Sequence, residues 1–284
     1  MLYFLAMTGI LLMLTGTFLE ESSTSIGKIS VRRRLESPYS FGFISTGLMS
    51  VMFLVIMLAR RHSLVFDPGS IPLLVLRIVL EAVHATITLY AITRADRSTF
   101  GFIRTLTIPT ILAVDLVLGY ALGWVHVAGI LLIVGALLYL FLNHGLTRRG
   151  AGLALASAFL GAATTSLFKY SITNFNSTEI DQAVVNAALT GYFLVMARLV
   201  YGENAVGSAL TRQSLVQSLL SASGGLAGSY AYLFAPGSVI MAARRAMAVF
   251  WSVLSGRAVF HERRLAIKLA ALFVCAMGLS LLAF

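Results

Sequence analysis

Charged residues are scarce in this sequence, and their scarcity excludes most soluble folds. Asp, Glu, Lys and Arg make up only 11% of the 284 residues, whereas 58% of the chain is hydrophobic. A soluble domain carries roughly 25% charged residues, which cover its outer surface. Because so few polar side chains are available here, we expect lipid rather than water to surround most of the molecule.

Cysteine and metal-binding patterns are nearly absent as well. The one cysteine, Cys275, lies inside an apolar run, so the chain has neither an internal disulfide framework nor a cysteine cluster for a metal. The five histidines show no His-x-x-x-His spacing, and no Ser/His/Asp arrangement typical of hydrolases is recognisable. We therefore expect no metal, no cofactor and no enzymatic activity.

Acidic residues are outnumbered by basic ones, 11 against 21, which gives a net charge of +10. The basic residues form short clusters between apolar runs rather than one polar face, so nucleic acid is not an expected partner. Most clusters follow odd-numbered runs, as at Arg32, Arg33 and Arg34, while the break after the sixth run is acidic through Glu179 and Asp181. This pattern predicts odd-numbered breaks inside the cell and both termini outside.

Apolar runs of membrane-spanning length recur along the whole chain. A spanning helix needs about 20 mostly apolar residues. The predicted spans are residues 2–27, 39–59, 71–92, 98–122, 125–142, 150–172, 182–201, 214–234, 238–260 and 265–284. The first run has no preceding basic segment, so we expect a spanning helix there rather than a cleaved signal peptide.

The two halves of the sequence resemble each other. Residues 18–28 align without gaps on residues 159–169, with identical Phe, Leu, Thr, Ser and Lys positions, and the same shift of 141 residues places Arg104 on Arg245. Because each repeat holds an odd number of spans, the second repeat enters the membrane in the opposite sense. The expected fold is an all-α integral membrane protein of about ten transmembrane helices, built as two inverted five-helix repeats, residues 1–145 and 146–284.

The end of the second half carries the most specific motifs. They are a helix with small residues at 250–256, the Phe-His-Glu-Arg sequence at 260–263 and Gly278 near the end of the chain. These features resemble the drug/metabolite transporter superfamily, in its ten-helix EamA-type branch, although Tyr120 and Ala121 replace the Glu-Arg turn in the first half. The resemblance implies a multi-pass protein of a bacterial inner (plasma) membrane, monomeric or homodimeric, with a small-molecule substrate.

Three polar side chains of the first predicted span share one helical stripe. Glu20, Thr24 and Lys28 follow i, i+4 and i+8 spacing, so they face the same cavity. A carboxylate in a membrane helix can carry a proton, and the spacing of Glu20 and Lys28 resembles that of the small multidrug resistance family. Thr24 is a candidate substrate-binding residue. In the alternative interpretation, Glu20 or Glu21 neutralises a neighbouring arginine.

Arginines within the predicted spans form the main candidate binding site. Arg104 and its repeat counterpart Arg245 are expected to reach one central cavity, with Arg244 beside them and Trp251 two turns further along. The Arg-Arg pair resembles the basic pair of plastid phosphate translocators, in which guanidinium forks suit phosphate or carboxylate. In the alternative interpretation, buried carboxylates such as Asp115 neutralise the arginines.

The third predicted span places Arg77, Glu81 and His84 at i, i+4 and i+7. We expect a salt bridge between Arg77 and Glu81 and a hydrogen-bonded core role for His84, with a proton relay as the alternative. Lys169, at the end of the sixth span, is expected to snorkel to the membrane interface. The candidate charge partners are therefore Glu21, Lys28, Arg77, Glu81, Asp115 and Lys169.

Small residues in the eighth and ninth predicted spans favour close helix packing. Gly224 and Gly228, like Ser252 and Gly256, have the small-x-x-x-small spacing that lets helix backbones approach each other. We expect a tight bundle around these positions.

Taken together, these residues predict a secondary-active transporter of a small organic, anionic or zwitterionic metabolite. Alternating access would expose Arg104, Arg244 and Arg245 to the substrate, with Glu20 as the proton-coupling group. One alternative is a proton-coupled exporter of cationic drugs or amines, in which Glu20 binds the cation. Another is a flippase for a lipid headgroup or lipid-linked sugar, which would need a lateral opening between helices.

Overall fold

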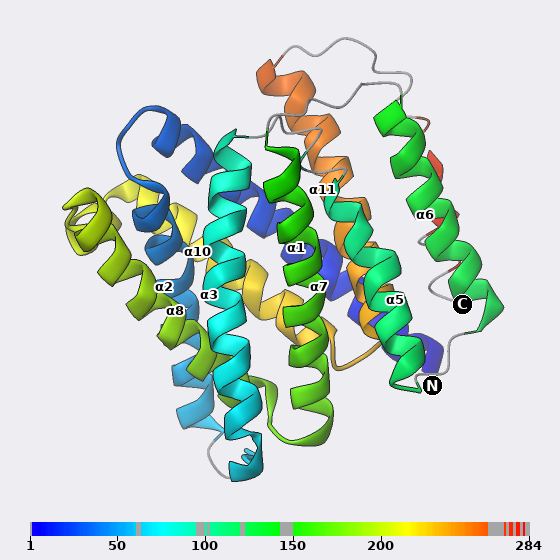
Figure 1. The fold of residues 1–284 in the computed structure, drawn as a ribbon. Coiled ribbons are helices and arrows are strands. Elements are labelled where there is room, and N and C mark those ends of the chain that lie inside the picture. The colour runs from blue at the N-terminus through cyan, green and yellow to red at the C-terminus, as the bar shows by residue number, and fades with distance from the viewer. Residues whose placement is uncertain are drawn as a thin grey trace.

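The computed structural model describes residues 2–60, 64–94, 100, 103–119, 123–142, 150–260, 270, 273–274, 277–278 and 281. Every regular element among these residues is a helix, so the all-α prediction is confirmed for them (Figure 1). Four of the helices are long and apolar enough to cross a membrane: Pro38–Ala59, Pro68–Ile92, Ala151–Asn174 and Thr178–Tyr201. Cys275, the 260–263 motif beyond Phe260 and most of the predicted span at 265–284 lie outside the described residues.

Two helices of the first half, α2 and η1, begin at side chains that cap their free backbone N–H groups. The Ser37 hydroxyl accepts a hydrogen bond from the Ser40 N–H, and Asp67 does the same for Gly69, each just before a proline. The elements are α1 (Leu2–Arg32), α2 (Pro38–Ala59), η1 (Pro68–Ser70), α3 (Ile71–Arg94), η2 (Arg104–Leu106), α5 (Thr107–Val117) and α6 (Trp124–Leu142).

The helices of the second half are separated by turns that glycine and small polar residues favour. Gly150 and Gly202 adopt left-handed conformations, with φ of 76° and 66°, immediately before α7 and after α8. The Thr211 hydroxyl caps α10 by accepting from the Ser214 N–H. The elements are α7 (Ala151–Asn174), α8 (Thr178–Tyr201), α9 (Ala205–Ala209), α10 (Arg212–Ala231) and α11 (Gly237–Phe260).

Two predicted boundaries need correction. Helix α8 begins four residues before the predicted start at 182, so Glu179 and Asp181 lie in its first turn rather than in an acidic break. Carboxylates are favourable there because the helix N-terminus is electropositive. The predicted span at 98–122 is a 3₁₀ turn at Arg104–Leu106 followed by the short α5, and residues 95–99, 101–102 and 120–122 lie outside the described part.

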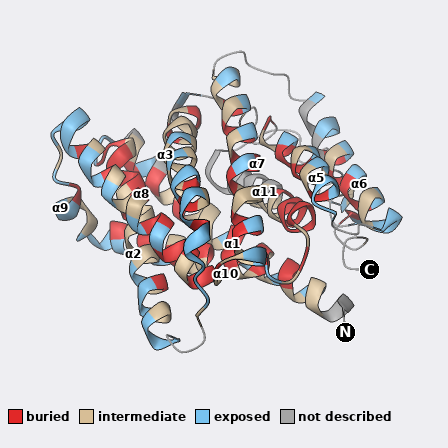
Figure 2. Cartoon of the chain, turned by 60° about the horizontal axis from the view of Figure 1, so that its bottom comes forward, coloured by how far each residue is buried: buried red, intermediate tan, exposed pale blue. Residues whose placement is uncertain are grey.

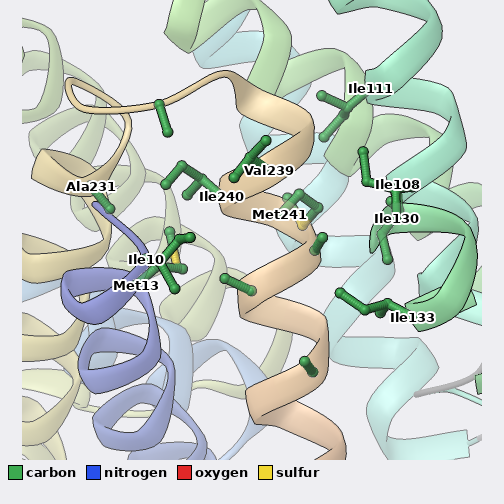
Figure 3. Close-up of a cluster of buried hydrophobic side chains, with 14 of the residues drawn as sticks. Ile10, Met13, Ile108, Ile111, Ile130, Ile133, Ala231, Val239, Ile240 and Met241 are labelled. Atoms are coloured by element: carbon green, nitrogen blue, oxygen red, sulfur yellow. The ribbon is translucent and has the colours of Figure 1, made fainter. Parts of the chain in front are cut away.

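Helix α11 lies at the centre of one half of the molecule. It packs against α1, α5 and α6, while α7 packs against α3 and α5, and α2 against α8 and α10. In the largest apolar cluster, Ile10 of α1 and Ile108 of α5 meet Ile240 and Met241 of α11 (Figure 3). Buried residues follow the inward faces of the helices in Figure 2. The outward faces are apolar too, as Leu199 at 74% exposure shows, and this pattern suits a lipid surrounding.

Glycines allow α1 and α10 to cross with their backbones in contact. A Cβ atom on Gly224 would lie 2.6 Å from the Gly16 carbonyl oxygen, and one on Gly16 would lie 2.7 Å from the Gly224 carbonyl oxygen. Both obstacles are backbone atoms, which cannot rotate away. The close packing predicted at Gly224 is therefore present, and it brings α1 near α11.

We expect Gly224→Ala to destabilise the fold by about 1–3 kcal/mol, because the added methyl group forces the two backbones apart. The matched control is Gly191→Ala in α8, where a Cβ would have no atom within 4 Å. Alanine there should be neutral or stabilising, since it favours a helix over glycine. Thermal unfolding of the purified proteins in detergent measures both effects. Equal melting temperatures for the two variants would contradict the role assigned to Gly224.

Candidate functional site

The neighbouring arginines of α11 point to two different helices. The guanidinium of Arg244 donates to the carboxylate of Glu20 on α1, with Nη2 and Oε2 2.5 Å apart. Arg245 is only 6% exposed, and its Nε donates to the hydroxyl of Thr107 at the start of α5 over 3.1 Å. Successive residues on a helix diverge by about 100°, so one pair of arginines connects α11 to two of its neighbours, α1 and α5.

Arg104 brings a third guanidinium to the same region. It is the first residue of η2, it stacks over the Phe100 ring at 5.2 Å, and its charge acts on Arg244 and Arg245. Its Nε is buried without a hydrogen-bond partner among the described residues. The structure thus brings together the three arginines that the sequence analysis singled out, and we call Arg104, Arg244 and Arg245 the arginine cluster.

Positive charge exceeds negative charge around the arginine cluster. Among the described residues, the carboxylates that act on it are Glu20, paired with Arg244, and Glu21, so three guanidinium groups there face two carboxylates. Charges removed from water are costly unless an opposite charge or hydrogen bonds compensate them. The cluster is therefore suited to an anionic group.

Trp251 lies where α11 runs alongside α1. Its indole Nε1 donates to the Ser25 hydroxyl over 3.2 Å, and Phe18 meets its ring edge-on with centroids 4.8 Å apart. Thr24 is half-buried on α1, one turn after Glu20. These residues form an aromatic and partly polar surface further along α11 than the arginine cluster. The side chain of Lys28 lies outside the described part.

Asp115 and Lys169 hold the turn that leads into α11. The Asp115 carboxylate accepts from the Ser238 N–H over 2.7 Å, at the first turn of α11. Lys169 is 9% exposed and donates to the Tyr232 carbonyl, at the end of α10. The expectation that Lys169 snorkels to the interface is wrong, because its ammonium group hydrogen-bonds to a buried backbone carbonyl instead. Both charges position α11 and hence the arginine cluster.

Arg77 has a different main partner from the predicted one. It pairs with the buried Asp181 of α8, whose other oxygen accepts from the Ser171 hydroxyl over 2.6 Å. The predicted contact between Arg77 and Glu81 is only a marginal one of 4.0 Å, and the Glu81 carboxylate lies 3.4 Å from His84 Nδ1. Arg77 therefore connects α3 to α8 instead of forming a salt bridge only within α3.

Arg60 follows the predicted span at 39–59 and Glu179 was expected in the break after the sixth run, yet the two side chains pair between α2 and α8. The guanidinium of Arg60 contacts the buried carboxylate of Glu179, which also accepts from the Tyr230 hydroxyl over 2.8 Å. The signal that could have found this pair is the acidic first turn of α8, where two carboxylates precede a long apolar helix.

Comparison with known proteins identifies a fold but no relative. No protein-family model matches the sequence, and no curated protein matches it. A solved structure described as "Crystal structure of protein" matches with a TM-score of 0.68, over 96% of this chain and 97% of that chain, at 14% identity. At that identity the likeness shows the fold alone, and it does so over nearly the whole length of both chains.

Two carboxyl groups, those of Glu36 and Glu203, act on each other at the connection between α1 and α2, outside the spans. Burial is the main cause that raises the pKa of Glu36 to about 7. The charge of Glu203 also raises this pKa, whereas a hydrogen bond with Ser30 lowers it. Glu203 itself accepts from the Ser37 N–H over 3.1 Å and from the Ser40 hydroxyl over 2.5 Å. The Glu203 carboxylate thus accepts these hydrogen bonds, whereas the Glu36 carboxyl is buried beside it.

The raised pKa of Glu36 predicts that stability falls as the pH rises. The folded state holds the Glu36 proton more tightly than the unfolded chain, in which the pKa of this carboxyl is 4.5. The favourable contribution is therefore complete below about pH 4.5 and is lost as the pH passes about 7. Glu36→Gln should flatten the decline in melting temperature between about pH 5 and pH 8. An unchanged pH profile in that variant would contradict the assignment.

Proposed function

We propose that this chain is a secondary transporter that moves a small organic anion or zwitterion by alternating access, with the arginine cluster as its binding site. The observation that carries the proposal is the convergence of three guanidinium groups from η2 and α11 on a region with two carboxylates. A partly buried excess of positive charge is costly for a purely structural element, and it is useful to a protein that binds anions.

Helix packing supports the two inverted repeats that this proposal includes. Under the shift of 141 residues, α1 corresponds to α7, α3 to α10, and the segment containing Arg104 to α11. The contacts of α1 with α10 and α11 then correspond to those of α7 with α3 and α5, and α2 pairs with its own counterpart α8. We propose ten spans in repeats 1–145 and 146–284, a member of the drug/metabolite transporter superfamily in its EamA-type branch, and a bacterial inner membrane as the location.

The binding step follows from the contacts of the arginines. A phosphate or carboxylate group of the substrate accepts paired hydrogen bonds from the planar guanidinium forks. To reach Arg244 it displaces the carboxylate of Glu20, which occupies that arginine at 2.5 Å. Arg245 is already oriented by Thr107, and Trp251 offers an apolar surface to the rest of the substrate. Rocking of one repeat against the other then exposes the site to the opposite side.

A cation exporter is the competing function. In it Glu20 binds the cation and exchanges it for a proton, as the position of a carboxylate in the first span allows. The ion pair of Glu20 with Arg244 opposes that role, because a bound cation would replace an arginine and lie beside the charges of Arg104 and Arg245. The anion transporter is therefore the better-supported function.

Replacing Arg104 or Arg245 by lysine tests the arginine cluster. Lysine keeps the charge but loses the planar fork, so the best anionic ligand should bind about tenfold more weakly. We would measure ligand-induced thermal stabilisation with a panel of organic phosphates, dicarboxylates, amino acids and amines, and uptake into proteoliposomes. The control is Arg212→Lys at the exposed start of α10, which should behave as the unmodified protein.

Glutamine at Glu20 separates the two functions. Glu20→Gln keeps the shape of the side chain but releases Arg244 from its carboxylate, so an anion should bind more tightly because its competitor is gone. A cation exporter would instead lose its ligand affinity in this variant. Stabilisation by amines that disappears in Glu20→Gln, together with normal transport by both lysine variants, would overturn the anion proposal.

A further inference from the structure

The crossing of α3 and α7 contains a carboxylate and an imidazole in contact. Glu81 Oε2 lies 3.4 Å from His84 Nδ1, one turn further along α3. The other ring nitrogen, Nε2, is buried and has no hydrogen-bond partner among the described residues. It lies against α7 at Gly161, where a Cβ atom would come within 3.0 Å of it. The glycine leaves room for the ring and places Nε2 in the interface between the two helices.

Glu81 makes only a marginal contact with the neighbouring arginine. Arg77 pairs with Asp181 of α8 and stacks over the Phe168 ring at 4.6 Å, whereas its distance to Glu81 is 4.0 Å. The carboxylate is therefore in position to stabilise a protonated His84. Besides His84, the groups that act on Glu81 are the charge of Arg77 and the hydroxyl of Thr164 on α7. Charged side chains elsewhere on the packed helices include Lys169 of α7, which donates to the Tyr232 carbonyl, and Asp181 of α8, which pairs with Arg77.

The pair packs against Gly161, the residue that the proposed repeat relates to Glu20. The shift of 141 residues places Gly161 on Glu20. At the crossing of α1 and α10, a Cβ on Gly224 would lie 2.8 Å from Cγ of Glu20. At the related crossing of α7 and α3 the roles are exchanged, because α7 supplies the glycine and α3 supplies the titratable side chain. Each crossing thus combines one glycine with one group that can carry a proton.

We propose that Glu81 and His84 form a proton-binding site that couples a proton to the transport cycle, an inference that rests on the proposed function. The neutral ring donates from Nδ1 to Glu81 and keeps the Nε2 lone pair free for a proton. A proton from water on one side adds to Nε2 and forms an imidazolium paired with the carboxylate. After the repeats have moved, Nε2 returns the proton to water on the other side, and no bond of the substrate changes.

Burial of Nε2 makes this exchange depend on the movement of the helices. The side chains of His84 and Glu81 are 14% and 20% exposed, yet the Nε2 atom itself is almost completely buried. The proton can therefore enter or leave only when α3 and α7 separate at Gly161. That condition is what coupling requires, because a permanently open site would leak protons.

Direct titration of the ring tests the proton site without any substrate. Nitrogen NMR of the full-length protein labelled at its five histidines resolves His84 by the signal that is lost in His84→Gln. In spectra recorded from about pH 5 to pH 8, we expect that signal to change as Nε2 takes up a proton, and the change to differ in Glu81→Gln because the imidazolium loses its carboxylate. A His84 signal that stays constant over this range would overturn the proposal.

Transport tests the coupling. With an inward gradient of about one pH unit, the best-stabilising anion of the panel should accumulate up to about tenfold in proteoliposomes. His84→Gln should reduce accumulation to the equilibrium level while exchange of preloaded anion continues, and His126→Gln, a histidine at the start of α6, should leave both unchanged. If His84→Gln does not fold, the same accumulation and exchange measurements on Glu81→Gln test the coupling.

The outcomes separate the two proposals. Failure of the unmodified protein to exchange any anion of the panel would overturn the proposed function, whatever the titration shows. Normal exchange with undiminished accumulation in both His84→Gln and Glu81→Gln would overturn the coupling role alone.

Discussion

A charge inside a helical bundle surrounded by apolar faces must meet an opposite charge or a hydrogen-bonding partner, and this constraint organises the structure. Arg77 meets Asp181, Arg60 meets Glu179, Lys169 meets a backbone carbonyl and Asp115 meets a backbone N–H. Each of these contacts joins two helices that are distant in the sequence. The arginine cluster differs from them because, among the described residues, it gathers more guanidinium groups than carboxylates, and this excess is the reason for proposing an anion as its partner.

Helix spacing decides how far these charges can reach. The contact of Gly16 with Gly224 lets α1 approach α10 at backbone distance, and Glu20 projects from the same stretch of α1. A larger residue at the crossing would move α1 outward and lengthen the distance from Glu20 to Arg244. The small residues and the ion pair therefore depend on each other, although the sequence presents them as separate motifs.

Most helices could be predicted from apolar runs, because length and hydropathy are local properties. The boundaries of α2, α6 and α11 lie within one residue of the predicted spans at 39–59, 125–142 and 238–260. The partners of the buried charges could not be predicted in the same way. Arg77 and Asp181 are 104 residues apart, and helical spacing favoured Glu81 as the nearer carboxylate. The gathering of Arg104 with Arg245 was expected from the proposed internal repeat, because such a repeat would relate residues that are distant in the sequence.

The two glycine crossings are in different states in this conformation, and the difference bears on the direction of a transport cycle. At the α1 crossing Glu20 is held in an ion pair with Arg244, whereas at the α7 crossing the Nε2 atom of His84 has no hydrogen-bond partner among the described residues. In an inverted repeat, the opposite conformation exchanges the environments of the two halves. Separation of α3 from α7 would then accompany tighter packing elsewhere, so release of a proton at His84 and displacement of Glu20 by an anion belong to successive steps rather than to one. In the proposed cycle, two non-equivalent groups at the related crossings would therefore impose an order of steps that two identical groups would not.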